Sequence, residues 1–451
     1  MAVVHFIKIS GGINFKLDGY NYLLSLCVIL LSTKIFSIIS RRAQLPQVVG
    51  ALMAGLFFGP AVLGTLTSKF FGVQFCLMPS ELLSRMAELG VIVIMFTAGM
   101  ETNIDELKAS GKVGFWVALS GVFVPLGMGA ALMYIFDHHT SFASAIFVGA
   151  VLTATSVSIT VETLKELGKM STKVGNTILA AALIDDILGL ICLTLITGMA
   201  GEEVNIMLVM TKILGFFVFV GIAGFAYYNS MVWSDRVQAA RNLRRYPVMG
   251  FAFCLFMAWA AETVFGIADI IGAFAAGMII SMSPKGQYIA SKFDTIAYLL
   301  LTPVFFANIG LEVTLPQMSY ELVIFTVALV IVSVISKLGG CGIGAKLCGF
   351  DVRQSYQIGL GMVCRGEVAL IVAGKGMSMN LIDENYLGPI IIMIIVCTII
   401  TPIVLKNAFK GQEDIAGNTV FEDKFMVEEQ ADEIEEDLFH RRRLLNMRTW
   451  E

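Results

Sequence analysis

The chain contains about thirteen runs of apolar residues that are long enough to cross the hydrocarbon core of a membrane. A transmembrane helix needs roughly 20 such residues, and helices satisfy every backbone polar group within the lipid. Of the 451 residues, 57% are hydrophobic and 15% are charged, whereas a soluble protein carries about 25% charged residues. The sequence therefore predicts an all-α polytopic membrane protein.

Charge asymmetry between the connecting loops predicts how the chain is oriented. We place the crossings near residues 20–40, 46–60, 86–100, 113–136, 142–161, 174–200, 205–230, 247–265, 267–282, 294–311, 321–345, 355–375 and 386–406. Most Lys and Arg residues of the loops fall in the odd-numbered connections, among them Arg41, Arg42, Lys108 and Lys112. Because cytoplasmic loops carry the excess of positive charge, we expect the N-terminus outside and the C-terminus in the cytoplasm of a cell membrane.

Two segments of the first half recur in the second half. The stretch Gln47–Gly55 is echoed by Asp269–Gly277, and Met95–Glu101 is echoed by Phe305–Glu312, at a spacing of roughly 210–220 residues. This spacing matches six helices plus a linker, so the two halves have opposite orientations in the membrane. Inverted repeats are typical of transporters, in which the substrate site lies near the midplane where the halves meet.

The repeat predicts the organisation of the whole chain. We expect an extracytoplasmic segment at 1–19, a first repeat at 20–204, a linker helix at 205–230 and a second repeat at 247–406. Residues 407–451 form a cytoplasmic tail that is acidic first and basic at its end. This order of charges favours a helix. The tail is interpreted as a solvated segment, with a regulatory device as the alternative.

Two adjacent carboxylates, Asp185 and Asp186, lie near the middle of the uncharged run between Lys173 and Glu202. A carboxylate at mid-membrane costs at least about 2.5–3.5 kcal/mol on insertion scales, and such residues usually face cavities and ion paths. Binding of a cation or a proton would offset this cost. The alternative is an acidic pair that only holds the helix bundle together.

Two cations also lie deep in apolar runs, Lys337 in the eleventh crossing and Arg365 in the twelfth. A buried cation needs a carboxylate or the carbonyls at a helix C-terminus as a partner. Successive helical residues point about 100° apart, so one aspartate of the pair can bind Lys337 while the other faces the ion path. Arg365 and Glu367 are interpreted either as a structural network or as functional residues.

Two crossings in corresponding positions of the repeats carry signs of interruption. The first contains the hydroxyl-rich run Thr153–Thr160, and the second has glycines around Arg365. Hydroxyl and carbonyl oxygens at an unwound turn can replace the hydration shell of a small cation. The alternative is ordinary bonding of the hydroxyl groups back to the helix backbone.

At these residues the chain resembles the cation:proton antiporter superfamily, in the branch that contains the NapA, GerN and Kef-type transporters. The resemblance rests on Leu45–Gly50, Phe58–Pro60, Glu88–Glu101, Thr153–Ser158, the Asp–Asp pair and Cys364–Leu370. It spans residues 20 to about 406. It implies two inverted six-helix repeats, two broken helices that cross, and a homodimer built from a panel-like dimerisation domain and a mobile core domain that moves like an elevator.

The resemblance also implies roles for individual residues. Asp186 would carry the ion or the proton, Asp185 would pair with Lys337, and Thr155 and Ser156 would lie where the broken helices cross. Members with two aspartates are commonly sodium/proton antiporters and are often electrogenic. Kef-type members usually replace the first aspartate and carry a large cytoplasmic domain, so the chain departs from that pattern.

The leading hypothesis is an antiporter that exchanges Na⁺ or Li⁺ for H⁺ by competition at Asp186. A potassium/proton antiporter of the same fold is the main alternative. A passive cation channel and an intramembrane aspartyl protease are remoter ones, and adjacent aspartates on one helix cannot flank a scissile bond. We expect no enzymatic activity, no cofactor and no nucleic-acid partner, since the scattered cysteines and the histidines at ends and in loops suit no zinc or haem site.

Overall fold

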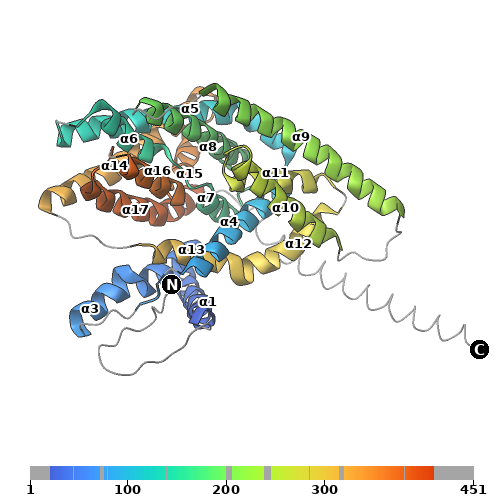
Figure 1. Ribbon diagram of the computed structural model, residues 1–451, viewed down its shortest axis with the longest axis horizontal. Helices are drawn as coiled ribbons and strands as arrows, with labels where there is room; N and C mark the ends of the chain where they lie inside the picture. Colours follow the sequence, from blue (N-terminus) through green and yellow to red (C-terminus); the bar gives the residue numbers. More distant parts are fainter. Residues whose placement is uncertain are drawn as a thin grey trace, which may run out of the picture. The chain divides into compact units, whose positions relative to one another are not determined.

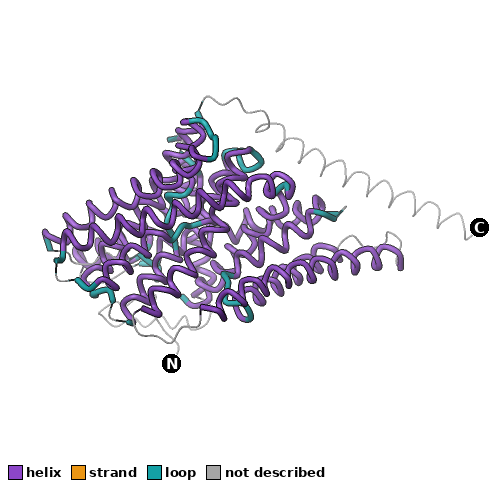
Figure 2. Tube along the Cα trace, turned by 90° about the horizontal axis from the view of Figure 1, so that it is seen from above, coloured by secondary structure: helices purple, strands orange, loops and turns teal. Residues whose placement is uncertain are grey.

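The computed structural model describes residues 21–43, 45–71, 76–78, 80–138, 140–199, 206–237, 245–283, 285–313, 319–379 and 381–410. Within these ranges the chain forms helices and short connections, with no β-strand (Figure 2). The prediction of an all-α protein is therefore confirmed. The predicted N-terminal segment at 1–19 and all but the start of the tail lie outside the described residues.

The helices follow the order of the predicted apolar runs. They are α1 (Asn21–Arg42), α2 (Gln47–Phe58), η1 (Pro60–Gly64), α3 (Thr65–Phe71), α4 (Glu81–Glu101), α5 (Ile104–Phe136), α6 (Phe142–Thr153), α7 (Val157–Glu166), α8 (Lys173–Met199), α9 (Ile206–Val237), α10 (Arg245–Thr263), α11 (Asp269–Ser281), α12 (Gly286–Ile296), η2 (Ala297–Leu301), α13 (Thr302–Leu311), α14 (Tyr320–Leu347), α15 (Val352–Gly361), α16 (Glu367–Ser378) and α17 (Glu384–Phe409). The η elements are single turns of π-helix.

Ten helical segments of the described chain are long and apolar enough to cross a membrane. Two shorter apolar helices, α11 and the segment Val368–Ser378 of α16, accompany them. The count of thirteen crossings stays a prediction. Several helices begin before the predicted apolar run, because a polar first turn with its own cap precedes the hydrophobic part. Asn103, for example, caps α5, which begins at Ile104, nine residues upstream of the run predicted at 113.

Both interrupted crossings are broken in the structure. The first divides into α6 and α7 at Ala154, Thr155 and Ser156. The second divides into α15 and α16 at residues 362–366. A break frees backbone groups that a membrane cannot hydrate, so each needs a partner supplied by the protein.

Packing sorts most helices into two groups (Figure 1). In the panel group, α2 packs on α1 and α13, α4 packs on α11, α12 and α13, and α10 packs on α11. In the core group, α5 packs on α6, α8 and α14, and α15 packs on α14 and α8. A buried hydrophobic cluster joins α6, α14, α16 and α17. The half-helix α7 bridges the groups, because it contacts α8 of the core group and α2 and α4 of the panel group.

Glycines let the panel helices approach closely at positions that the repeat relates. A methyl group at Gly55 on α2 would collide with the backbone of Ala307 on α13. Likewise, a methyl group at Gly277 on α11 would collide with the backbone of Phe96 on α4. Small residues at helix crossings are a common packing device in membranes, where no hydrophobic effect drives helices together. The segments that echo each other in sequence thus form two equivalent helix pairs.

Candidate functional site

The acidic pair lies on α8, and its first member is held by a lysine from α14. Lys337 Nζ donates to both carboxylate oxygens of Asp185, at 2.8 and 2.9 Å. The Lys337 side chain is 0% exposed and that of Asp185 is 2% exposed. Asp186 is partly exposed. Neighbouring positions of a helix point about 100° apart, so the two carboxylates face different surroundings.

A glycine of α5 makes room for this ion pair. The helix lies between α8 and α14, and a methyl group at Gly121 would come within 2.5 Å of Cys341 Sγ and 3.5 Å of Lys337 Nζ. Gly121 is not among the residues that the sequence marks as functional. It is one of several glycines in α5, so the sequence does not distinguish it from the others. The space that Lys337 needs is seen only once α5 is packed between α8 and α14.

The two broken helices cross and satisfy each other's freed backbone groups. Ser156 donates its backbone N–H to the carbonyl of Cys364 at 2.9 Å. The hydroxyl of Thr160 donates to the carbonyl of Gly361, the last residue of α15, also at 2.9 Å. A methyl group at Gly366 would approach Ser156 Oγ to 2.7 Å. The crossing is therefore a close, hydrogen-bonded contact of the two repeats.

Arg365 occupies the second break and is fully buried, with a side chain 0% exposed. Its Nη1 donates to the carbonyl of Ala154, which caps the C-terminus of α6, at 2.9 Å. The backbone carbonyl of Arg365 accepts from the Thr398 hydroxyl of α17. Among the described residues, its Nε and Nη2 atoms have no hydrogen-bond partner. A helix C-terminal carbonyl is one of the two partners that the sequence predicts for this cation.

The hydroxyl-rich run contains both kinds of residue that the sequence allows: hydroxyls bonded back to the helix and hydroxyls at an unwound turn. Thr153 bonds back to the carbonyl of Ala150 at 2.7 Å, as in an ordinary helix. Thr155 and Ser156 lie in the break itself, and both are buried. The hydroxyl of Thr155 approaches the carbonyl of Met362 at 3.5 Å, a long contact. Glu367 is the first residue of α16, and its side chain lies outside the described part of the structure.

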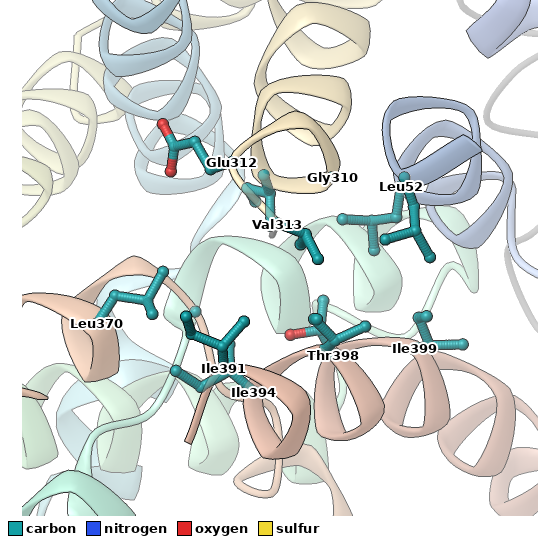
Figure 3. A pocket seen from close by; sticks show the side chains of 13 residues that line it. Leu52, Gly310, Glu312, Val313, Leu370, Ile391, Ile394, Thr398 and Ile399 are labelled. Atoms are coloured by element: carbon teal, nitrogen blue, oxygen red, sulfur yellow. The ribbon is translucent and has the colours of Figure 1, made fainter. Parts of the chain in front are cut away.

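A cavity separates the two helix groups next to the second break. Its empty volume is about 620 Å³, including the open mouth. Gly366 of the second break is among the lining residues. Leu52 and Gly310 line the panel side, and Leu370 and Thr398 line the core side (Figure 3). Glu312, at the end of α13, is the one carboxylate among the lining residues of this cavity. The described residues contain no cluster of His, Cys, Asp and Glu that could hold a resident metal ion.

Comparison with known proteins defines the class of this protein. The family described as "Sodium/hydrogen exchanger, transmembrane" matches residues 27–411, and the chain belongs to this family. The chain is 37% identical to the Na(+)/H(+)-K(+) antiporter GerN of Bacillus cereus over 396 residues, which covers 87% of this chain and 98% of the relative. It is 35% identical to a Na(+)/H(+) antiporter of Enterococcus hirae over 390 residues, covering 84% and 96%. The resemblance inferred from the sequence motifs is therefore confirmed.

Solved structures show the same fold. The sodium proton antiporter MjNhaP1 of Methanocaldococcus jannaschii matches with a TM-score of 0.66 at 15% identity, over 88% of this chain and 100% of that one. A second structure of MjNhaP1, at pH 8, matches with a TM-score of 0.58 over 86% and 96%. The predicted antiporter fold is confirmed, and the family and its named members are transporters rather than enzymes.

Proposed function

We propose that this protein is a secondary active antiporter that exchanges Na⁺ or Li⁺ for H⁺ across the cell membrane. The observation that carries the proposal is the buried Asp185–Lys337 ion pair next to Asp186, on a helix that packs against the crossing of two broken helices. The names of the relatives, which describe Na⁺/H⁺ antiporters, support the same exchange.

The two aspartates have different roles in this proposal. Lys337 binds both oxygens of Asp185, so this carboxylate is the counter-charge of the lysine. Asp186 is partly exposed and exchanges its ligand, either a proton or a cation. The two ligands exclude each other, and this exclusivity couples the two fluxes. Thr155 and Ser156 line the ion path at the crossing, and Arg365 with Glu367 stabilises the second break.

Alternating access follows from movement of the core group against the panel group. The cavity between α2 and α13 on one side and α16 and α17 on the other supports this proposal, because it opens along the boundary of the groups. We propose an elevator-like displacement of the core group in a homodimer whose panel groups form the interface. The N-terminus lies outside and the C-terminus in the cytoplasm, as the loop charges indicate.

The carrier role of Asp186 is tested with a pH-sensitive dye in everted membrane vesicles. A pulse of Na⁺ should release protons from vesicles that contain the wild type and should give no response with Asp186→Ala. Asp105→Asn is the matched control, because it removes an exposed carboxylate from the first turn of α5, a helix that packs against α8. An undiminished Na⁺ response of Asp186→Ala would refute the assignment.

Electrogenic exchange requires a second charge, which we assign to Lys337. If Lys337 releases its proton when Asp185 is recruited by the cation, Lys337→Gln should transport Na⁺ without generating current. A Lys337→Gln protein that still generates current under a sodium gradient contradicts this step. Asp185→Asn/Lys337→Gln is the companion variant, since it leaves no unpaired charge to destabilise the fold.

A potassium/proton antiporter is the second candidate, because the name of the GerN relative includes K⁺. Selectivity depends on the spacing of oxygen ligands around the ion. Transport driven by Na⁺, Li⁺ and K⁺ in turn, in one preparation of proteoliposomes, distinguishes the candidates. Cation flux without any proton movement would instead indicate a channel.

A further inference from the structure

The inverted repeat relates two lysines that the exchange reaction does not use. Lys165 lies on the half-helix α7 and follows its first residue, Val157, by eight positions. Lys375 lies on the half-helix α16 and follows its first residue, Glu367, by the same eight positions. The two lysines are therefore equivalent residues of the two repeats.

Two glutamates are related in the same way. Glu101 ends α4 and Glu312 follows the last residue of α13, each in a Gly-x-Glu sequence. The two helices are antiparallel, because Gly90 of α4 approaches Leu301 near the start of α13, while Lys165 bridges the end of α4 to α12. Glu101 and Glu312 consequently lie at opposite ends of the same helix pair.

One of the two equivalent lysine–glutamate pairs is formed in this structure. Lys165 Nζ lies 3.3 Å from Glu101 Oε1 and 3.9 Å from an oxygen of Asp294 on α12. It also donates to the hydroxyl of Thr97 at 3.1 Å. The neighbouring Glu166 accepts from the backbone N–H of Gln47 at the start of α2, at 2.7 and 2.8 Å. These bonds fasten α7, which also contacts α8 of the core group, to the panel group at one end.

The opposite end is open and carries the equivalent residues. Glu312 borders the cavity, on the wall that faces Leu370 of α16 (Figure 3). Its carboxylate accepts from Asn308 Nδ2 at 2.7 Å. Asn308 precedes Glu312 by four residues, and Thr97 precedes Glu101 by four residues, so Asn308 and Thr97 are equivalent in the two repeats. Glu312 is therefore bound by Asn308, whereas Lys165 binds the equivalent residue, Thr97, at the other end. Lys375 is exposed further along α16.

We propose that Lys165 and Lys375 are positioning residues that latch the two ends of the transporter in alternation. Lys165 binds Glu101 while the cavity is open, and Lys375 binds Glu312 once the core group has moved and the cavity has closed. Replacing one ion pair by its equivalent keeps the two states close in free energy, which a transporter that cycles between them needs. The inference rests on the proposed alternating access of the core group.

The test measures how open the cavity is in each variant. Ile395 lines the cavity, so a cysteine introduced there reacts with a membrane-impermeant maleimide only while the cavity is open. The protein with its native cysteines provides the background. Labelling depends on conformation and not on the transported ion, so a failure of the proposed exchange would leave this result interpretable.

The two lysine variants should act in opposite directions. Lys165→Gln removes the bond that holds the cavity open, so labelling should slow by about threefold to fivefold, the change expected when an ion pair that contributes about 1 kcal/mol or less is lost. Lys375→Gln removes the bond of the closed state, so labelling should stay level or become faster. Faster labelling in Lys165→Gln, or slower labelling in Lys375→Gln, overturns the proposal.

Further variants separate a latch from a merely structural contact. Lys165→Arg, which keeps the charge that Glu101 and Asp294 bind, should retain wild-type labelling. Glu101→Gln breaks the same ion pair and should slow labelling as Lys165→Gln does. It serves as the test variant if Lys165→Gln does not fold. Lys173→Gln on α8 and Lys69→Gln on α3 are matched controls without an effect, because neither lysine joins the two helix groups.

Discussion

The buried ion pair Asp185–Lys337 gives the sharpest prediction about stability. Replacing Lys337 by Met leaves the Asp185 carboxylate, which is 2% exposed, without its counter-charge. Breaking one partner of a buried pair costs about 3–5 kcal/mol, because the remaining charge stays desolvated. Asp185→Leu should cost a similar amount for the same reason, since it leaves the ammonium group of Lys337 uncompensated.

The double variant Asp185→Leu/Lys337→Met removes both charges and should recover most of this loss. Apolar residues of similar volume often replace a buried ion pair with little change in stability. The double-mutant cycle should therefore give a coupling energy of at least about 3 kcal/mol. The free energy of unfolding would be measured by equilibrium denaturation in mixed detergent micelles for the wild type and the three variants.

An exposed ion pair of the same protein is the control for this cycle. Arg85 and Glu88 are 3.0 Å apart, with side chains 68% and 57% exposed. Such pairs contribute about 1 kcal/mol or less, so Arg85→Ala/Glu88→Ala should show a correspondingly small coupling. Additive losses in the Asp185–Lys337 cycle, with the double variant as unstable as the sum of the singles, would refute the reasoning.

Three further substitutions test the surroundings of the site. Gly121→Ala should destabilise the fold by about 1–3 kcal/mol through overpacking against Cys341, and Gly121→Ala/Cys341→Ala should relieve this in the same unfolding assay. Gly366→Ala should abolish Na⁺-driven proton release in vesicles while expression persists, because the added methyl group lies 2.7 Å from the Ser156 hydroxyl oxygen. Thr160→Val should lower the free energy of unfolding by about 1 kcal/mol through loss of its bond to the second break.

The order of the helices can be predicted directly from the hydrophobic runs of the sequence. The positions of their polar ends cannot be predicted in this way. The run predicted at 294–311 is part of a longer helical segment, Gly286–Leu311, with a π-helical turn in its middle. Its first turns, before residue 294, carry Lys292 and are too polar to be found by hydropathy. The glycines around Arg365 predict the second break, since glycine destabilises a helix interior. The first break has no glycine or proline, and it is stabilised by the hydrogen bond from the Ser156 N–H to the carbonyl of Cys364 in the other broken helix.

The charged residues of the site could be named from the sequence, because each lies alone in an apolar run. Their partners are set by packing. Periodicity places Asp185 and Asp186 on different faces of α8 without saying which one meets Lys337. The role of Gly121 and the bond of Lys165 to Glu101 need the positions of three helices at once.

The central claim is that Asp186 exchanges a cation for a proton, with Asp185 as the counter-charge of Lys337 while no cation is bound. The most direct measurement is proton movement in proteoliposomes of purified protein under imposed gradients of Na⁺, Li⁺ and K⁺, for the wild type and for Asp186→Asn. We predict proton efflux driven by Na⁺ or Li⁺ in the wild type and none with Asp186→Asn. Cation-driven proton movement of unchanged size in Asp186→Asn would contradict the claim.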